Sequence, residues 1–308
     1  MTMASILPGA PRGFVIEPSH DRTGDVTAPI PIDDPADPRL ADYRQVRERD
    51  LAGRDGFIAE GQVVLEKLVR GGRHPLRSVL VAEKRLAGLA GLLAELPQGV
   101  AVYAAGQAVM DAVVGFPIHR GILAVGERRP VAPEALLATL SARALVVGLV
   151  GIANHDNMGG LFRNAAAFGA DAVLLDETCC DPLYRKAIRV SVGAALTIPF
   201  AIAGRAEDLA HSLAGAGFSV AALSPQGEVD LADFEPASRT AALFGAEGPG
   251  LPQSVLDRVC GVRIPMAGGF DSLNVATASG IVLHHLAGKA RDRPFKGRLN
   301  SPLGTVVR

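Results

Sequence analysis

The chain has 308 residues, enough for two domains of ordinary size, and its 48% apolar and 20% charged residues indicate a globular protein. No apolar run reaches the roughly 18 residues that a membrane-spanning helix needs, and the first residues do not resemble a secretory signal. The three cysteines have neither zinc-site nor disulfide spacing, so we expect a cytoplasmic protein with reduced thiols, no metal site and no membrane partner.

The two ends of the chain differ in composition and charge. Residues 1–38 are rich in Pro, Asp and Gly and hold two basic and six acidic side chains. They show neither a helical nor a strand period, so we expect an irregular arm. Residues 289–308 hold six basic side chains and one acid, and we expect 291–308 to be a basic tail. This asymmetry is typical of a polyanion-binding protein, but two solvated tails would produce it as well.

A small α/β domain is predicted over residues 39–129. The apolar spacing in "GFIAEGQVVLEKLVRG" predicts a helix that ends at Gly71 or Gly72. Strands and helices then alternate. The expected strands cover 77–83, 100–105 and 121–128, and the expected helices cover "AGLAGLLAEL" and "AVMDAVVG". Residues 130–142 are expected to be a linker.

A second α/β domain is predicted over residues 143–290. It begins with "ALVVGLVG", a continuous apolar run typical of a strand covered on both faces. The later expected strands cover 171–175, 199–203, "FSVAALS", 240–247 and 261–267, and the expected helices cover 159–168, 182–194, 206–216, a short segment near Pro252 and 273–289. The alternation predicts a mostly parallel sheet, in which ligands bind beyond the carboxyl ends of the strands.

Three turns at that edge of the sheet carry the polar residues. In the first, 151–160, Asn157 and Asp156 can cap the following helix, and Gly159 with Gly160 permits close approach of another backbone. Arg163 follows among apolar neighbours. That setting favours a binding role, and the alternative is a surface arginine.

The second turn, "LFGAEGPGLP", lies within residues 243–252. Its glycine spacing is G-x-x-G-x-G, which differs in register from the dinucleotide-binding pattern and argues against an NAD or flavin protein. Glu247 is enclosed by glycines at the end of a strand, which makes it a candidate binding residue. In the third turn, 266–274, Ser272 is expected to cap the last helix.

Taken in order, the three turns resemble the motifs of the SpoU (TrmH-like) family of RNA ribose 2′-O-methyltransferases, in the SPOUT class. The matching patterns are N-x-G-x-x-x-R (157–163), G-x-E-G-x-G-L (245–251) and I-P-M-x-G…S-L-N-V (264–275). The resemblance covers about 143–288. Residues 42–129 resemble the family's N-terminal RNA-binding domain of L30e-like fold, through "FIAEG" and "HRGILAV".

The resemblance implies a knotted fold, a cofactor and a set of site residues. The C-terminal domain is expected to form a deep trefoil knot and a homodimer, and to bind S-adenosylmethionine and RNA. The matching catalytic positions are Arg163, Asn157, Glu247 and Asn274. The expected cofactor contacts are Gly245, Ile264 and Leu273, with Leu243, Met266 and Ser272 as neighbours.

The sequence departs from the family pattern in two places. Where the family usually has Asp-Pro before the first-motif Asn, this chain has His155 and Asp156. His155 could act as a base, since histidine titrates near neutral pH, or could simply replace the proline in the loop. The serine that commonly follows Val275 in the third motif is Ala276 here.

Two questions stay open at the level of sequence. Arg163 could remove the proton of the ribose hydroxyl, or remain charged and hold a phosphate or developing oxyanion, which is physically easier. The RNA could be 23S ribosomal RNA, which the N-terminal domain favours, or transfer RNA. A third possibility is a non-catalytic RNA-binding or ribosome-assembly protein, against which the intact motif residues argue.

Overall fold

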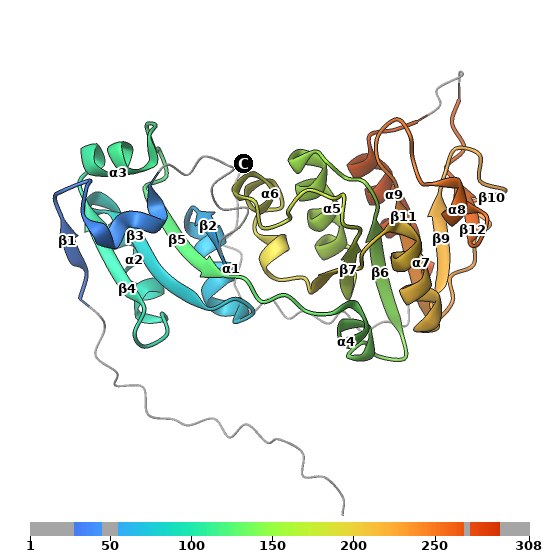
Figure 1. Cartoon of the computed structure of the whole chain (residues 1–308), viewed down its shortest axis with the longest axis horizontal. Helices are drawn as coiled ribbons and strands as arrows, with labels where there is room; N and C mark the ends of the chain where they lie inside the picture. Colours follow the sequence, from blue (N-terminus) through green and yellow to red (C-terminus); the bar gives the residue numbers. More distant parts are fainter. Residues whose placement is uncertain (1–27, 45–54, 268–271, 290–308) are drawn as a thin grey trace, which may run out of the picture.

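The structure is a computed structural model and describes residues 28–44, 55–267 and 272–289. In this part of the chain, the strands form a five-stranded sheet and a seven-stranded sheet. The two sheets lie at opposite ends of an elongated molecule, and helices cover both (Figure 1). No helix of the described ranges is long and apolar enough to cross a membrane.

The N-terminal unit contains the five-stranded sheet. Its strands are β1 (Ile30–Ile32), β2 (Gly56–Glu60), β3 (Leu76–Ala82), β4 (Ala101–Ala105) and β5 (Ile122–Glu127). Its helices are α1 (Gln62–Gly71), α2 (Leu86–Ala94) and α3 (Gln107–Val114), with short 3₁₀ segments at Pro38–Tyr43 and Glu83–Arg85. The strand order is β1-β4-β3-β5-β2, and β5 runs antiparallel to both of its neighbours.

The prediction of an irregular arm is wrong for residues 30–32 and for Pro38. Residues Ile30–Ile32 form β1, which pairs in parallel with β4 at the sheet edge, where a proline is tolerated. Asp37 then caps the Pro38–Tyr43 turn, and Tyr43 is fully buried with its hydroxyl 2.7 Å from Ser78 Oγ. The short apolar segment is a strand only because β4 offers a free edge. Residues 1–27 lie outside the described residues.

The prediction of one helix up to Gly71 or Gly72 is right only for its second half. Residues Gly56–Glu60 form β2, antiparallel to β5, and α1 begins at Gln62. All five residues of β2 are buried. Gly61 lies between the two elements with φ of 97°, a backbone conformation that other residues adopt only at a cost. The apolar run was ambiguous, because short buried strands and buried helices share that pattern.

The C-terminal unit contains the seven-stranded sheet, which is parallel throughout the described strands. Its strands are β6 (Ala144–Leu149), β7 (Ala172–Leu175), β8 (Phe200–Ile202), β9 (Ser219–Leu223), β10 (Val229–Asp230), β11 (Arg239–Phe244) and β12 (Cys260–Arg263). The strand order is β10-β12-β9-β11-β6-β7-β8. The predicted α/β class and parallel sheet are therefore confirmed. The strand expected over 261–267 ends earlier, at Arg263.

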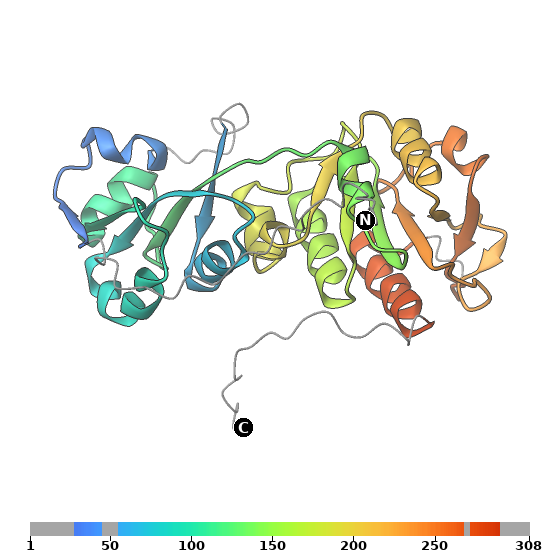
Figure 2. The ribbon, with the colours of Figure 1, turned by 90° about the horizontal axis from the view of Figure 1, so that it is seen from below.

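Helices cover both faces of this sheet (Figure 2). They are α4 (Pro133–Ala138), α5 (His155–Ala167), α6 (Arg185–Val190), α7 (Ala206–Gly215), α8 (Gln253–Leu256) and α9 (Val275–Lys289), with a 3₁₀ turn at Ala194–Leu196. The description of residues 130–142 as a linker is incomplete, because α4 lies inside them. Its Leu136 and Leu137 join the core on one face of the sheet. The expected tail, 291–308, lies outside the described residues.

The segment around α6 joins the two units. Leu183, Ile188 and Leu196 are buried in the same core as Phe57 and other residues of the N-terminal sheet. Two ion pairs cross the same junction, Arg128–Asp181 and Arg185–Glu60. The helix expected over 182–194 is interrupted, because the chain turns with positive φ at two successive residues, Val192 (53°) and Gly193 (76°).

Candidate active site

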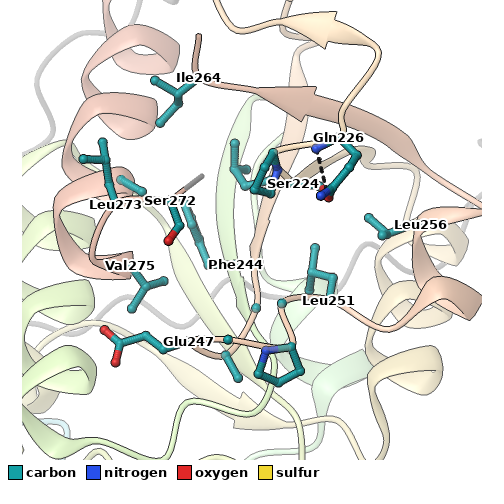
Figure 3. Close-up of a pocket in the computed structure, with 18 of the residues that line it drawn as sticks. Ser224, Gln226, Phe244, Glu247, Leu251, Leu256, Ile264, Ser272, Leu273 and Val275 are labelled. Atoms are coloured by element: carbon teal, nitrogen blue, oxygen red, sulfur yellow. Dashed lines mark hydrogen bonds between the residues drawn. The ribbon is translucent and has the colours of Figure 1, made fainter. Parts of the chain in front are cut away.

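A cavity of about 580 Å³ lies beyond the carboxyl ends of β9, β11 and β12 (Figure 3). This is the edge at which open parallel sheets bind ligands. The predicted site residues that line it are Gly245, Glu247, Ile264, Met266, Ser272, Leu273 and Asn274. Two of the three predicted turns therefore meet at one cavity.

The loop after β11 folds back on itself. A Cβ at position 245 would stand 2.3 Å from the carbonyl carbon of Gly250, so only glycine fits there. The Gly250 N–H donates to the carbonyl oxygen of Ala246 at 3.0 Å and closes the loop. Gly248 and Gly250 have φ of 88° and 70°, and no atom lies within 4 Å of where their Cβ would stand. Their backbone is therefore open to a ligand.

The first motif lies in the first turns of α5. The cap is Asn154, whose Oδ1 accepts from the N–H groups of Asp156 and Asn157, so the predicted capping by Asp156 or Asn157 is wrong. The motif's Asn157 is helical and 8% exposed. Its side chain is thus free to bond outside its own helix.

Both glycines of the first motif lie at helix contacts. A Cβ at Gly159 would stand 2.6 Å from Val190 Cβ in α6, and one at Gly160 would stand 2.7 Å from Ala276 Cβ in α9. The predicted close approach of another backbone is confirmed at Gly159, where a Cβ would stand 2.9 Å from the Ala187 carbonyl oxygen, whereas Gly160 meets a side-chain carbon. This second contact also places the departure at Ala276, whose Cβ lies at the contact of α9 with Gly160 of α5.

The cap of α9 is Asn274 rather than the predicted Ser272. Its Oδ1 accepts from the N–H groups of Ala276 (2.9 Å) and Thr277 (3.2 Å). Ser272 lies further upstream and lines the cavity. An asparagine cap keeps its amide nitrogen available, which a serine cap could not do.

Asn157, Glu247 and Asn274 form one hydrogen-bonded network. Asn157 Nδ2 donates to Glu247 Oε1 at 2.9 Å. Asn274 Nδ2 donates to Asn157 Oδ1 at 2.9 Å and to Glu247 Oε1 at 3.0 Å. One residue from each of the three predicted motifs therefore meets the other two at the cavity.

The helix cap sets the direction of this network. Because Asn274 Oδ1 is occupied by two backbone N–H groups, its nitrogen must point towards Asn157 and Glu247. Asn157 Oδ1 then accepts, and its own nitrogen donates to the carboxylate. Glu247 Oε1 receives both donations, and its second oxygen has no hydrogen bond from another residue that the structure describes. The carboxylate can accept a further proton or hydrogen bond.

Three of the predicted site residues do not line the cavity. Asn157 is connected to it only through its hydrogen bonds to Glu247 and Asn274, whereas Leu243 and Arg163 lie away from it. Leu243 is fully buried in β11 and would clash with any side chain at Gly148 of β6, so it points to the opposite face of the sheet. Phe244 follows it and lines the cavity instead. Strand alternation accounts for the difference, since successive side chains point to opposite faces.

Arg163 is the second such residue. It is exposed on α5, and it forms no hydrogen bond or ion pair with another described residue. Its electrostatic neighbour is Lys67 of α1, whose pKa is lowered by burial and, in addition, by the positive charge of Arg163. Arg163 thus faces the junction between the two units.

His155 packs against α6 rather than into the cavity. Its ring lies 3.9 Å from the ring of Tyr184, centroid to centroid, at an interplanar angle of 37°. Its neighbour Asp156 pairs with Lys186 at 2.7 Å. This contact favours the packing interpretation of His155 over a role as base.

The structure adds residues that the sequence analysis missed. Leu223, Ser224 and Gln226 at the end of β9 line the cavity, because β9 lies between β11 and β12. The turn-forming sequence "SPQG" was the available signal. Asn164 was also missed. Its Nδ2 donates to the Ala276 carbonyl oxygen at 2.6 Å and lies 2.9 Å from Ser279 Oγ, which ties α5 to α9.

Comparisons with known proteins found related sequences and structures. The model of the SpoU rRNA Methylase family matches residues 144–284. An uncharacterized tRNA/rRNA methyltransferase of Mycobacterium bovis is 40% identical over 262 residues, covering 82% of this chain and 89% of the relative.

Two solved structures have the same fold over most of the chain. The AdoMet-bound rRNA methyltransferase from Sinorhizobium meliloti superposes with a TM-score of 0.72 at 23% identity, covering 83% of this chain and 97% of that one. An RNA 2′-O ribose methyltransferase superposes with a TM-score of 0.68 at 24% identity, covering 85% and 100%. At these identities the likeness establishes the fold alone.

Proposed function

This chain belongs to the SpoU rRNA methylase family of RNA methyltransferases, and we propose that it transfers the methyl group of S-adenosylmethionine to a ribose 2′-hydroxyl of RNA. The observation that carries the proposal is the network of Asn157, Glu247 and Asn274 at the cavity. Three segments far apart in sequence converge there, and each supplies the polar residue that its motif predicts.

The cavity fits the proposed cofactor in size and chemistry. Its volume of about 580 Å³ lies within the roughly 300–1,000 Å³ of small-molecule sites. Phe244, Leu251 and Ile264 supply apolar walls for a flat base (Figure 3). The glycines of the 245–251 loop expose backbone groups that can hydrogen-bond its polar edge. When bound, S-adenosylmethionine supplies an electrophilic methyl on a sulfonium that is already a good leaving group.

The protein's task is therefore mainly orientation, which can account for much of a barrier reduction. Asn157 and Asn274 hold the Glu247 carboxylate in a fixed position, and its second oxygen can accept a hydrogen bond from an attacking hydroxyl. We assign Asn157 and Asn274 to positioning the carboxylate, and Glu247 to orienting that hydroxyl and receiving its proton, directly or through water.

For Arg163 we propose the role of charged anchor. A guanidinium stays protonated near neutral pH, which makes it a poor base and a good partner for a phosphate. The exposure of Arg163, without a carboxylate partner among the described residues, supports binding to an external anion. Arg163 is also close enough to Lys67 of α1 to lower the pKa of that lysine, in addition to the larger effect of burial.

For the substrate we propose 23S ribosomal RNA, with transfer RNA as the second candidate. The solved neighbour from Sinorhizobium meliloti is named an rRNA methyltransferase, and the mycobacterial relative is named a tRNA/rRNA methyltransferase. The presence of an N-terminal unit beside the methyltransferase unit also favours the ribosomal choice, by analogy with the family.

Three expectations drawn from the family remain proposals. They are an L30e-like character for the N-terminal unit, a trefoil knot in the C-terminal unit and a homodimer. The path of the chain supports the knot. After β12, Ile264 and Met266 and then Ser272 to Asn274 line the cavity, and α9 packs against α5 and β11.

Substitution of Arg163 tests the proposal. Arg163→Ala should lower methyl transfer from tritiated S-adenosylmethionine to RNA by about 100-fold or more, the usual effect of removing one charge-stabilising donor. Cofactor affinity, measured by calorimetry, should stay within about twofold. Arg163→Lys should recover part of the activity, because lysine keeps the charge and loses only the planar fork.

The substrate is identified by mass spectrometry of RNA from cells with and without the gene. One 2′-O-methyl nucleotide of 23S ribosomal RNA should be missing without the gene. A change confined to transfer RNA would overturn the ribosomal choice. No change in any 2′-O-methyl nucleotide, together with an inactive purified protein, would overturn the enzymatic proposal.

A further inference from the structure

A second concave surface lies at the junction of the two units. It has a volume of about 360 Å³ and is separate from the methyl-transfer cavity, with which it shares no residue. Three arginines line it, namely Arg85, Arg120 and Arg189, together with His119. None of its lining residues is an acid. We call this surface the arginine groove.

The three arginines are available to an external anion. All are exposed, and none forms an ion pair or a side-chain hydrogen bond with another residue that the structure describes. Other arginines of the same region behave differently, since Arg128 pairs with Asp181 and Arg185 pairs with Glu60. The lining of the groove thus gathers positive side chains without an acid among them, which favours binding of a polyanion.

The groove is built from both units. Arg85 and Arg120 belong to the N-terminal unit, and Arg189 belongs to α6 of the C-terminal unit. Arg120 lies directly over Gly61, since a Cβ there would stand 3.0 Å from its Nη1. The positions of these charges therefore depend on how the units are joined.

The backbone at the junction is strained next to Arg189. Val192 has φ of 53° and lines the groove, and a β-branched residue in this region is a genuine outlier. The turn brings Gly193 against α1, where a Cβ would stand 3.0 Å from Lys67 Cδ. Such strain persists where the surrounding structure holds it, and it is often found at binding sites.

The groove leads towards Arg163. Lys67 packs on Gly193 beside the groove, and its pKa is lowered by burial and, in addition, by the charge of Arg163. Positive groups therefore run from Arg120 and Arg189, past Lys67, to Arg163 on α5. This arrangement suits the repeated phosphates of one strand better than a single small anion.

We propose that the arginine groove binds the phosphodiester backbone of the RNA substrate, away from the ribose that is methylated. The inference rests on the proposed function and extends it by giving the RNA a second contact that both units must form together. Arginine suits this task because its planar fork binds phosphate oxygens in pairs. Backbone contacts fix the register of a nucleic acid without reading its sequence.

The test removes one arginine from each unit. The full-length Arg120→Ala/Arg189→Ala variant is compared with Arg143→Ala/Arg258→Ala, which removes the same charge from exposed positions elsewhere. The probe is fluorescein-labelled 20-nucleotide polyuridine, titrated at several salt concentrations. Circular dichroism melting checks that both variants are folded.

The groove variant should bind the probe about tenfold more weakly at low salt. The slope of log K against log salt should fall by about 1.4, because each contact on a single strand contributes about 0.7. The control variant should match wild type. With total RNA as substrate, the groove variant should show a raised KM and an unchanged affinity for S-adenosylmethionine.

Two results would separate the inference from the proposed function. If wild type methylates RNA and the groove variant matches it in probe affinity, salt slope and KM, the groove inference is overturned and the function stands. If wild type neither binds the probe nor methylates RNA, the proposed function is overturned together with the groove.

Discussion

The methyl-transfer cavity and the arginine groove differ in whether their polar side chains are hydrogen-bonded to other residues of the protein. In the cavity, Asn157, Glu247 and Asn274 are bonded to one another, and a helix cap fixes the direction of the network. In the groove, the side chains of Arg120 and Arg189 form no hydrogen bond or ion pair with another described residue. A site that performs chemistry needs groups held in one geometry, whereas a site for a repeating phosphate chain needs charge left available.

The largest expected effect comes from breaking the cavity network without losing its helix cap. Asn274→Asp keeps an oxygen for the N–H groups of Ala276 and Thr277, but it places a carboxylate against Glu247. Methyl transfer should fall about 100-fold, the effect of losing one preorganised donor. Thermal unfolding should change little.

The matched control is Asn154→Asp, which makes the same change in the cap of α5. The Asn154 side chain accepts hydrogen bonds from backbone N–H groups of its own helix. Aspartate caps a helix as well as asparagine does. Its methyl transfer, measured in the same tritium assay, should stay within about twofold of wild type. Equal losses in the two variants would show that the caps, and not the network, matter.

A smaller effect is expected from distorting the loop that closes the cavity. Gly245→Ala places a Cβ 2.3 Å from the carbonyl carbon of Gly250, so the backbone must move. Affinity for S-adenosylmethionine should fall about tenfold by calorimetry, and the free energy of unfolding should fall by about 1–3 kcal/mol, as for other overpacked sites.

Gly91→Ala is the control for the loop substitution. Gly91 is exposed in the middle of α2, and no atom lies within 4 Å of where its Cβ would stand. The change should raise the free energy of unfolding by about 0.5–1 kcal/mol, because alanine loses less entropy in a helix. A Gly245→Ala variant that binds cofactor normally would contradict the role given to the loop.

The smallest expected effect comes from comparing the substitution of a paired arginine with that of an unpaired one. Arg128→Ala removes a partly exposed ion pair with Asp181 and should lower the free energy of unfolding by about 1 kcal/mol or less. Polyuridine affinity should not change. Arg120→Ala should do the opposite and weaken RNA binding without changing stability. Weakened RNA binding in both variants would mean that an arginine at the junction contributes to RNA binding whether or not it is paired with a carboxylate.

Much of the fold could be predicted where an apolar pattern in the sequence is compatible with only one kind of secondary structure. The buried parallel strands, such as β6 and β11, follow directly from continuous apolar runs and the turns after them. Prediction failed where context decided, as in β2, whose apolar run suits a helix or a strand equally well until β5 pairs with it. The β1 strand is similar, since three residues next to a proline carry too little signal without β4.

The candidate site was likewise predictable only in part. The sequence predicted Asn157, Glu247 and Asn274 from motif order, and the structure places them within hydrogen-bond distance of one another. It did not predict that Leu243 would face away from the cavity, because the register of a strand against its neighbours sets that direction. It also gave the wrong cap for α5 and for α9, since several polar residues near each start could cap it.

The sequence by itself determined the α/β class, the family, and the residue types that the chemistry requires, because these depend on local periodicity and on motifs in fixed order. Only the tertiary structure decided which of those residues share a site. Arg163 lies six positions from Asn157, yet it neighbours Lys67 at the junction, while Asn157 is hydrogen-bonded to Glu247 and Asn274. The arginine groove likewise exists only because two sheets are joined through α6, which brings Arg189 beside Arg120 from far along the chain.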